Sequence, residues 1–341
     1  MTDPADISAA ISEGRRLSVA PMMDWTDRHC RFLHRQLSRH ALLYTEMVTA
    51  AAVVHGDRDR LLGFSPAEKP VALQLGGSEP ALLAEAVRAA LDYGYGEINL
   101  NVGCPSDRVQ SGAFGACLMR EPDLVARCCA AMIDAAEGRA EITVKSRIGV
   151  DEQDPERVLP DFIDRVAAVG VRHFAVHARK AWLDGLSPKE NRDIPPLDYP
   201  LAIAMKRRRP DLNISINGGI ASLEAAEALL GEGMDGAMIG RAAYHDPTSI
   251  LAAADRRIFG ADEPEATPEG AVEAMLPYIE ARLTEGTRLN QITRHMLTLF
   301  QGRPGARRWR RTLSEGAHLP GAGPELVAKA LGELAPASEA A

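Results

Sequence analysis

The stretch of residues 98–106, INLNVGCPS, places groups that could do chemistry at the end of an extended segment. Apolar and polar residues alternate at its start, so Asn99 and Asn101 are predicted to project from one face of a strand. Gly103 then interrupts the strand, and Cys104 follows it, directly before a proline that cannot donate to a sheet. A thiol presented beside two amides could donate a proton or act as a nucleophile. The alternative is that Cys104 is a small buried hydrophobic residue, the commoner role of cysteine.

Cationic side chains are predicted at the ends of the next two extended segments. Lys145 and Arg147 are two residues apart, so they face the same side of a strand. Two cations withdrawn from water need an anion or an electron-rich ring as a partner. Glu46 or another carboxylate could be that partner instead. His177 ends the following segment, and its position near Arg179 favours a binding role over an ordinary hydrogen bond within the fold.

Glycines follow the last two extended segments, where barrel enzymes usually bind phosphate. Asn217 precedes Gly218 and Gly219, and Gly240 precedes Arg241. Glycines allow backbone N–H groups to approach an anion closely, and Arg241 adds a positive charge. The alternative for the glycine pair is an ordinary left-handed turn, but two glycine sites at both expected positions favour a phosphate.

These residues lie on a regular alternation of predicted strands and helices. Helix signals occur between the strands, for example over residues 81–91 and 223–230. This pattern predicts an α/β fold, a (β/α)8 TIM barrel over residues 1–260, with a doubly wound open sheet as the competing arrangement. The predicted strands cover residues 17–22, 42–47, 71–76, 97–101, 142–147, 173–178, 213–217 and 236–240.

Polar or reactive residues fall at the carboxyl ends of nearly all of these strands. Barrel enzymes build their active sites on that face, which favours the barrel over the open sheet. The residues concerned are Met22, Met23, Glu46, Gln74, Asn101, Cys104, Lys145, Arg147, His177, Asn217 and Arg241.

Two long loops are predicted on the same face. Residues 105–119 contain several chain-breaking residues and are expected to form a mobile lid over Cys104. Residues 180–199 combine Trp182 with Lys189 and Arg192. Cationic and aromatic residues together can bind a phosphate backbone and stack a base, although Trp182 could equally pack the loop onto the barrel.

No strand is predicted beyond the barrel, and residues 265–332 are expected to form a small helical domain. Helices are predicted over residues 271–283 and 289–301, with a short one after residue 305. Residues 333–341 are expected to be a flexible tail.

The helical region carries a concentrated positive charge. The chain has a net charge of −8, which taken globally disfavours a polyanionic partner. Residues 286–313 nevertheless contain seven arginines and no acidic residue. A charge run is usually a solvated face, but this uncompensated one favours a nucleic-acid phosphate track that includes Arg308 and Arg311.

Composition restricts the remaining classes. The chain has 341 residues, 46% hydrophobic and 25% charged, as in a soluble globular protein, and no apolar run is long enough to span a membrane. Its five cysteines form no metal-binding or disulfide spacing, so no metal site is predicted. The N-terminus has no signal-peptide pattern, and a reducing cytoplasm is the expected compartment.

Several ordered motifs together resemble the tRNA-dihydrouridine synthases, over nearly the whole chain. Subfamily A is the most similar, because of the segments 186–199 and 294–311. Ser146 departs from the family's usual larger residue, but it is predicted to face away from the site. The shared motifs lie at residues 20–28, 99–106, 144–149, 177–180, 217–220 and 240–241.

The resemblance implies an FMN-binding barrel and a helical domain that binds tRNA. Cys104 would be the catalytic acid, Asn101 and Arg147 would hold the uracil carbonyls, and Lys145 would also stabilise the anionic reduced flavin. The tRNA contacts would include Lys189, Arg192, Arg308 and Arg311. The flavin would be lined by Pro21, Met22 and Met23, hydrogen-bonded by Gln74 and Lys145, and held on its ring and phosphate side by His177, Asn217, Gly218, Gly219, Gly240 and Arg241.

The implied reaction is reduction of the C5=C6 bond of U20 and U20a in the tRNA D-loop. NADPH, as a transient reductant, would reduce FMN; hydride would then pass to uracil C6 while Cys104 delivers a proton to C5. No protein partner is implied. Two alternatives are a non-catalytic tRNA-binding scaffold and a dihydroorotate dehydrogenase-like enzyme acting on a free pyrimidine, which would need no basic helical domain.

Overall fold

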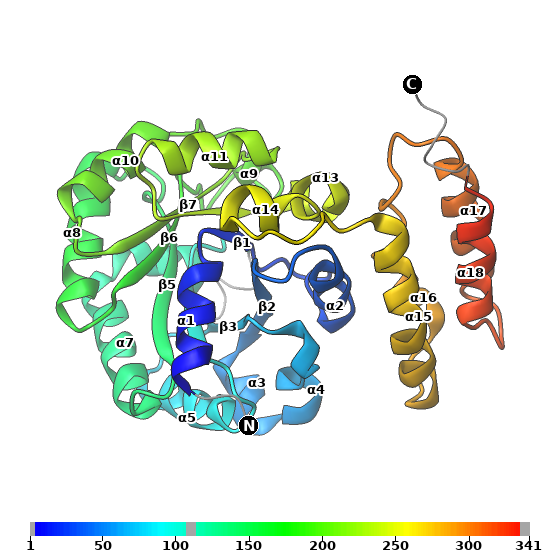
Figure 1. The fold of residues 1–341 in the computed structure, drawn as a ribbon. Helices are drawn as coiled ribbons and strands as arrows, with labels where there is room; N and C mark the ends of the chain where they lie inside the picture. The colour runs from blue at the N-terminus through cyan, green and yellow to red at the C-terminus, as the bar shows by residue number, and fades with distance from the viewer. Residues whose placement is uncertain (1–3, 107–113, 335–341) are drawn as a thin grey trace.

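Eight parallel strands form one closed barrel in the computed structural model, which describes residues 4–106 and 114–334 (Figure 1). β1 pairs with β2 on one side and with β8 on the other, which closes the sheet and excludes an open one. The predicted (β/α)8 TIM barrel is therefore confirmed. The strands are β1 (Leu17–Val19), β2 (Leu42–Thr49), β3 (Val71–Gly76), β4 (Glu97–Val102), β5 (Glu141–Arg147), β6 (His173–His177), β7 (Asn213–Asn217) and β8 (Gly236–Ile239).

All eight predicted strands are present, and the largest difference is at the end of the first. β1 ends at Val19, three residues before the predicted end. The chain turns there because the amides of Trp25 and Thr26 both donate to the Met22 carbonyl, at 3.1 and 3.0 Å. This turn directs residues 20–26 over the carboxyl end of the barrel instead of along it.

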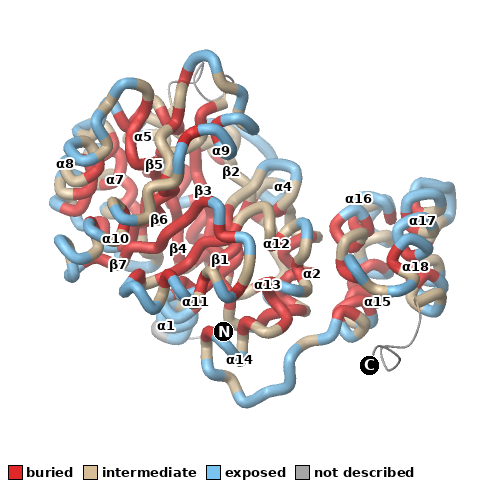
Figure 2. The backbone as a smooth tube through the Cα atoms, turned by 90° about the horizontal axis from the view of Figure 1, so that it is seen from above, coloured by how far each residue is buried: buried red, intermediate tan, exposed pale blue. Residues whose placement is uncertain are grey.

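Helices and short helical turns surround the barrel, and buried residues concentrate in the strands and in the inward faces of the helices (Figure 2). The helices predicted over residues 81–91 and 223–230 are α5 and α11. The elements before residue 260 are α1 (Pro4–Gly14), α2 (Arg28–Leu37), α3 (Ala50–His55), α4 (Arg58–Leu62), η1 (Pro66–Glu68), α5 (Pro80–Leu91), η2 (Gly115–Arg120), α7 (Pro122–Ala136), α8 (Pro155–Ala168), α9 (Glu190–Asp193), α10 (Tyr199–Arg208), α11 (Leu223–Gly231), α12 (Arg241–His245), α13 (Pro247–Leu251) and α14 (Ala254–Phe259).

A group of four helices lies beside the barrel: α15 (Pro268–Thr284), α16 (Leu289–Thr293), α17 (Ala306–Gly316) and α18 (Pro324–Gly332) (Figure 1). The prediction of one long helix over residues 289–301 is wrong beyond Thr293, where α16 ends. Tight turns follow instead, and the Met296 carbonyl accepts a hydrogen bond from the Trp309 indole at 2.9 Å. The same carbonyl also accepts from the Leu299 amide at 3.2 Å, a three-residue turn in place of the four-residue turn of an α-helix.

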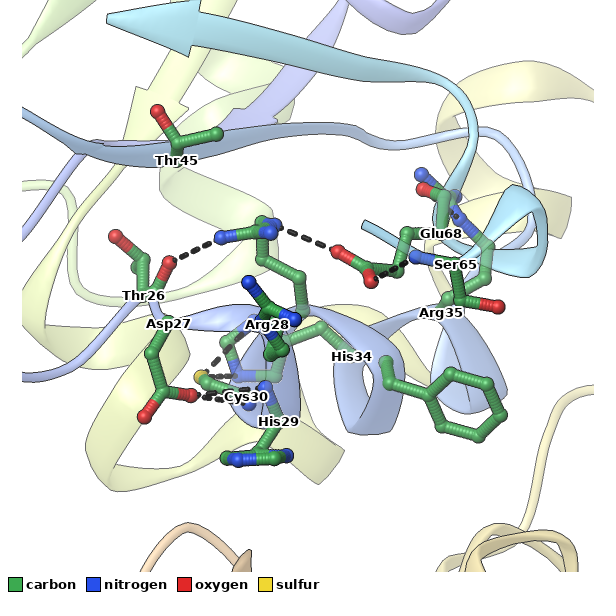
Figure 3. Close-up of polar contacts among 12 residues, drawn as sticks. Thr26, Asp27, Arg28, His29, Cys30, His34, Arg35, Thr45, Ser65 and Glu68 are labelled. Carbon is green, nitrogen blue, oxygen red and sulfur yellow. Dashed lines mark hydrogen bonds and ion pairs between the residues drawn. The ribbon is translucent and has the colours of Figure 1, made fainter. Parts of the chain in front are cut away.

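Helix α2 joins the barrel to this helical group. Asp27 caps the helix by accepting from two backbone amides of its first turn, and Figure 3 shows it beside His29. Further along α2, Phe32 stacks on Tyr278 of α15 with ring centroids 3.9 Å apart. Asp27 also forms an ion pair with Arg294, at 2.6 Å. Contacts of more than one kind therefore hold the two parts together.

Two predictions fall partly outside the described residues. Residues 107–113 of the predicted lid and 335–341 of the predicted tail are not described. Within the described part of the chain, no helix is long and apolar enough to cross a membrane.

Candidate active site at the mouth of the barrel

A cavity of about 520 Å³ opens at the carboxyl ends of the strands. This is the face on which barrel enzymes carry their active sites. Of the predicted site residues, the cavity is lined by Pro21, Met22, Met23, Gln74, Asn101, Cys104, Lys145, Arg147, His177, Arg192, Asn217, Gly218, Gly219, Gly240 and Arg241.

Cys104 lies at the cavity wall in the turn that follows β4. The Asn101 side-chain oxygen accepts from the amides of Gly103 and Cys104, at 3.1 and 3.0 Å, and so fixes this turn. The Cys104 carbonyl accepts from the Ala116 amide at 2.9 Å. The thiol is 3.5 Å from the Ser106 hydroxyl. Cys104 is only partly buried, unlike three of the other cysteines, so it is not a core hydrophobic residue.

A directional chain of hydrogen bonds runs from this turn into the barrel. The Asn101 amide nitrogen donates to the Gln74 carbonyl oxygen, and the Gln74 amide nitrogen donates to Asn99, both at 2.8 Å. Asn99 then donates to Thr143, and Thr143 donates to Glu97, again both at 2.8 Å. Gln74 and Asn101 are thereby held in one orientation by buried side chains below them.

This series of hydrogen bonds ends on a buried ion pair at the opposite end of the barrel. Glu97 accepts from two nitrogens of Arg15, at 2.9 and 2.7 Å, and both side chains are buried. Arg15 also contacts Glu141 at 2.5 Å. The orientation of the site amides is therefore anchored on charged groups far from the mouth.

Lys145 places an ammonium group at the cavity, and no carboxylate of the described residues pairs with it. Its Nζ donates to the Asn217 side-chain oxygen at 3.0 Å, and the Asn217 amide nitrogen donates to the Met238 carbonyl at 2.7 Å. Burial, together with the charge of Arg147, lowers the pKa of Lys145 to about 7. In the described chain Glu46 is not its partner, because that carboxylate accepts from the Asp24 amide at 2.5 Å.

Arg147 connects three segments around the cavity. Its Nε donates to the Gly103 carbonyl at 3.2 Å, and its Nη1 donates to the carbonyls of Lys180 and Asn191 at 3.2 and 2.9 Å. Burial lowers the pKa of Arg147 to about 10. Arg147 also borders the cavity. Its contact with a uracil carbonyl stays a prediction.

The glycine turn after β7 is shaped by packing as well as by backbone conformation. Gly218 and Gly219 have φ values of +109° and +69°, which L side chains rarely adopt. A Cβ atom on Gly218 would lie 2.5 Å from the His177 ring. Burial, followed by the positive charges of Arg147 and Lys145, lowers the pKa of His177, so its imidazole is neutral at neutral pH.

Arg241 borders the cavity but is already paired. Its Nη2 lies 2.7 Å from Asp193, and both side chains are partly exposed. Exposed ion pairs are weak, and the contact of Arg241 with a phosphate stays a prediction.

Three of the predicted tRNA contacts lie outside the cavity. Lys189 is exposed just before α9, and Arg308 and Arg311 are exposed on α17, whose Trp309 and Leu313 are buried as predicted. The basic stretch is partly neutralised, because Arg294 pairs with Asp27 and Arg303 pairs with Glu269, each at 2.6 Å. These two arginines are therefore structural contacts.

Some cavity residues were missed from the sequence. Trp25 borders the cavity and stacks on Tyr244, with centroids 4.6 Å apart and rings 9° from parallel. Its position within the motif of residues 20–28 was the available signal. Met47 and Pro188 also border the cavity. Over residues 4–106 and 114–334, no group of three or more His, Cys, Asp or Glu side chains could hold a metal ion.

Solved structures with a similar fold include old yellow enzymes. The homologue from Zymomonas mobilis has a TM-score of 0.51 and 14% identity, over 75% of this chain and 92% of that one. The enzyme from Trypanosoma cruzi has a TM-score of 0.52 and 11% identity, over 76% of this chain and 93% of that one. At these identities the likeness concerns the barrel fold alone.

Sequence relatives are much more similar. A protein of Escherichia coli O6:H1 named tRNA-dihydrouridine(20/20a) synthase is 58% identical over 96% of this chain and 98% of its own. Proteins of the same name from Vibrio cholerae and Synechocystis are 57% and 58% identical, over 94% and 92% of this chain and 96% and 93% of theirs. The family model described as dihydrouridine synthase (Dus) matches residues 18–334. This chain therefore belongs to the dihydrouridine synthase family.

Proposed function

We propose that this protein reduces the C5=C6 bond of uridine in tRNA to give 5,6-dihydrouridine, with FMN as cofactor and NAD(P)H as reductant. The observation that carries the proposal is the position of Cys104 on the same cavity as the Lys145 ammonium, which donates to Asn217 and has no ion-pair partner among the described residues. A proton donor and a cation on one cavity suit the addition of a hydride and a proton across an electron-poor double bond.

The residues present fit a flavin mononucleotide. A cavity of about 520 Å³ is in the size range of cofactor sites. Lys145 is a half-buried cation with no carboxylate partner in the described chain, which suits an electron-rich or anionic ring. At the other side, Gly218 and Gly219 border the cavity in a left-handed turn, a backbone conformation that can present N–H groups to a phosphate.

Each predicted flavin residue then has a defined task. FMN, when bound, supplies the hydride for the uracil ring. Gln74 and Lys145 would hold its ring, and the segment of residues 21–23 would cover one edge. Its phosphate would be held by Asn217, Gly218, Gly219, Gly240 and Arg241, with the neutral His177 against the ring.

The protein's own residues complete the reduction. Asn101 and Arg147 would hold the uracil carbonyls and draw electron density from the C5=C6 bond. The Cys104 thiol would transfer its proton from Sγ to C5, while the S–H bond electrons stay on sulfur. The resulting thiolate is reprotonated from solvent before the next turnover.

We propose that tRNA reaches the mouth through the arginine-rich face of α17 and the loop before α9. Arg308, Arg311, Lys189 and Arg192 would bind its phosphates. The relatives are named for positions 20 and 20a, and U20 and U20a are the proposed targets. A cytoplasmic location follows from that substrate.

The test is nucleoside mass analysis of unmodified tRNA after incubation with the protein, FMN and NADPH. Wild-type protein is expected to form dihydrouridine, and Cys104→Ala is expected to be slower by about 100- to 10,000-fold. Absence of dihydrouridine with the flavin-loaded wild type would contradict the proposal and favour a binding scaffold. Reduction of a free pyrimidine, but not of tRNA, would favour the alternative flavin enzyme.

A further inference from the structure

Asn191 is a fully buried amide in a loop that is otherwise largely exposed. Its side chain has 0% exposure and lies in α9, behind the cavity wall. Its oxygen accepts from the Trp182 amide at 2.7 Å. Its nitrogen donates to the carbonyls of Trp182 and Leu186, at 2.8 and 3.1 Å. One carboxamide thus closes the loop of residues 182–191.

The backbone of Asn191 continues this network to the site. Its carbonyl accepts from Arg147 Nη1 at 2.9 Å, the shortest of the three hydrogen bonds of that guanidinium. Arg147 Nε in turn donates to the Gly103 carbonyl, one residue before Cys104. Asn191, Arg147, Gly103 and Cys104 are therefore connected by direct contacts.

The other end of the loop is attached to the barrel independently. The Ala181 amide donates to the Gly149 carbonyl at 3.0 Å, and the Leu183 amide donates to Asp151 at 2.7 Å. At the far end of the loop, where Arg192 borders the cavity, Asp193 accepts from Arg241 at 2.7 Å and its carbonyl accepts from Arg179 at 3.5 Å. Asn191 adds the contacts that tie this end to Trp182 and Leu186. Without these three side-chain hydrogen bonds, the Asn191 carbonyl is held less firmly against Arg147.

Arg147 depends on this carbonyl because it has no ionic partner in the described part of the chain. Three backbone carbonyls replace a carboxylate around a buried guanidinium. Losing one acceptor leaves a buried charged donor unsatisfied, which favours movement of the guanidinium toward the cavity. Such a movement would also release the Gly103 carbonyl.

We propose that Asn191 is a positioning residue for the proton transfer: by closing its loop and holding Arg147, it fixes the turn that aims the Cys104 thiol. The inference rests on the proposed function, in which Cys104 is the proton donor. On the cofactor side of the cavity, the hydrogen bonds from Lys145 to Asn217 and from Asn217 to the Met238 carbonyl involve neither Asn191 nor Arg147.

The test compares Asn191→Ala and Asn191→Asp with Asp184→Ala, an exposed residue of the same loop, in flavin-loaded protein. Oxidation of the reduced flavin by saturating tRNA is expected to slow by about 100-fold in both Asn191 variants, because small displacements of a reacting group have large effects. FMN affinity and reduction by NADPH are expected to stay within about twofold of wild type, as is every rate of the Asp184 control.

A second readout does not need the reaction. The rate at which iodoacetamide alkylates Cys104 is measured by peptide mass analysis over a range of pH. The other four cysteines serve as internal references. Alkylation of Cys104 is expected to become severalfold faster in the Asn191 variants, because the turn is no longer fixed. Asn191→Asp tests the donor role, since its carboxylate would face two carbonyl oxygens; Asn191→Ser, which can keep one hydrogen bond, is expected to be intermediate.

Two outcomes would overturn the inference. One is a tRNA-dependent rate and a Cys104 alkylation profile that stay at the wild-type level in the Asn191 variants. The other is a parallel loss of FMN affinity, which would make the loop a general wall of the cavity. Failure of the wild type to form dihydrouridine is a different result and counts against the proposed function.

Discussion

At the scale of single residues, the polar groups of the mouth hold one another in place. Asn101 uses its oxygen for the Cys104 turn and its nitrogen for Gln74. Lys145 is the exception, because among the described residues its half-buried ammonium has a single amide oxygen as hydrogen-bond partner. A bound ligand is expected to change the pKa of such a group most, because the group still has unused donors facing the cavity.

The pH dependence of FMN affinity is therefore expected to follow Lys145. In the free protein its pKa is lowered to about 7 by burial and by Arg147. Because an electron-rich or anionic ring binds the ammonium form, binding above this pKa requires proton uptake. Affinity is expected to weaken as pH rises above about 7, by up to about tenfold per pH unit. Fluorescence titration of FMN at several pH values measures this dependence of the affinity on pH.

Lys145→Met is the control for this assignment. It removes the ammonium and keeps most of the side-chain volume, so FMN is expected to bind more weakly at neutral pH. The fall in affinity above pH 7 is expected to disappear. An equally steep fall in Lys145→Met would show that another group titrates.

At the scale of strands and helices, much of the arrangement follows from local patterns. Each of the eight strands was recognisable because apolar runs are bounded by glycine, proline or polar residues, and its carboxyl end was marked by residues such as Lys145 and Asn217. The predicted helix over residues 289–301 failed beyond Thr293, where three-residue turns and a hydrogen bond from Trp309, a distant residue, replace the helical pattern. Likewise, nothing local to Asn191 or Arg294 indicates a contact with Arg147 or Asp27.

The buried series of hydrogen bonds across β3, β4 and β5 ends at Glu97, so Glu97→Gln is expected to have a large effect on stability. The substitution leaves Arg15 buried with one carboxylate fewer, so the free energy of unfolding is expected to fall by about 3–5 kcal/mol. Glu141→Gln is the matched control: it removes the other partner of Arg15, whose side chain is 37% exposed, and is expected to lose about 1 kcal/mol or less. Urea unfolding at neutral pH measures both.

The ion pair of Arg15 and Glu97 also predicts how the difference in the free energy of unfolding between wild type and Glu97→Gln varies with pH. Burial, the largest single influence, would raise the pKa of Glu97, but the charges of Arg15 and His173 and the hydrogen bonds from Tyr44 and Arg15 together lower it from 4.5. A lowered pKa means that the stabilisation is fully present above the unfolded value and is lost as pH falls through the folded one. Wild type and variant are expected to converge in stability in acid. A difference that stays constant from neutral pH into acid would contradict this account.

At the scale of the whole molecule, charge is unevenly divided between the barrel and the helical group. The chain is net negative, whereas α17 carries Arg307, Arg308, Arg310 and Arg311 on its exposed side. Long-range attraction of a polyanion would therefore act on the helical group first and bring it beside the barrel mouth.

The double variant Arg308→Ala and Arg311→Ala is expected to weaken tRNA binding and its dependence on salt. The slope of log affinity against log salt concentration is expected to fall by roughly 0.7–0.9 for each phosphate that the protein no longer neutralises. The control is Arg39→Ala with Arg207→Ala, two arginines that are 73% and 70% exposed elsewhere on the surface. Equal reductions in both double variants would indicate a net-charge effect and not a binding surface.

The contact between Asp27 and the helical group predicts a division between the two halves of the reaction. Asp27→Asn keeps the cap of α2, because asparagine caps helices as well as aspartate does. It removes the charge that binds Arg294 at 2.6 Å and His295 at 3.1 Å. The position of the helical group would then be less well defined, while Lys145 and the glycine turn stay in place.

Reduction of the flavin by NADPH is accordingly expected to be unchanged in Asp27→Asn, and the KM for tRNA is expected to rise by about tenfold, the effect of losing one charged hydrogen bond. Rapid-mixing measurements of the two half-reactions separate these effects. The turn of residues 22–26 joins Asp27 to the cavity through Trp25, so a slower NADPH step would mean that the substitution distorts the site itself. An unchanged KM for tRNA would mean that the helical group is held by α15 and Phe32 alone.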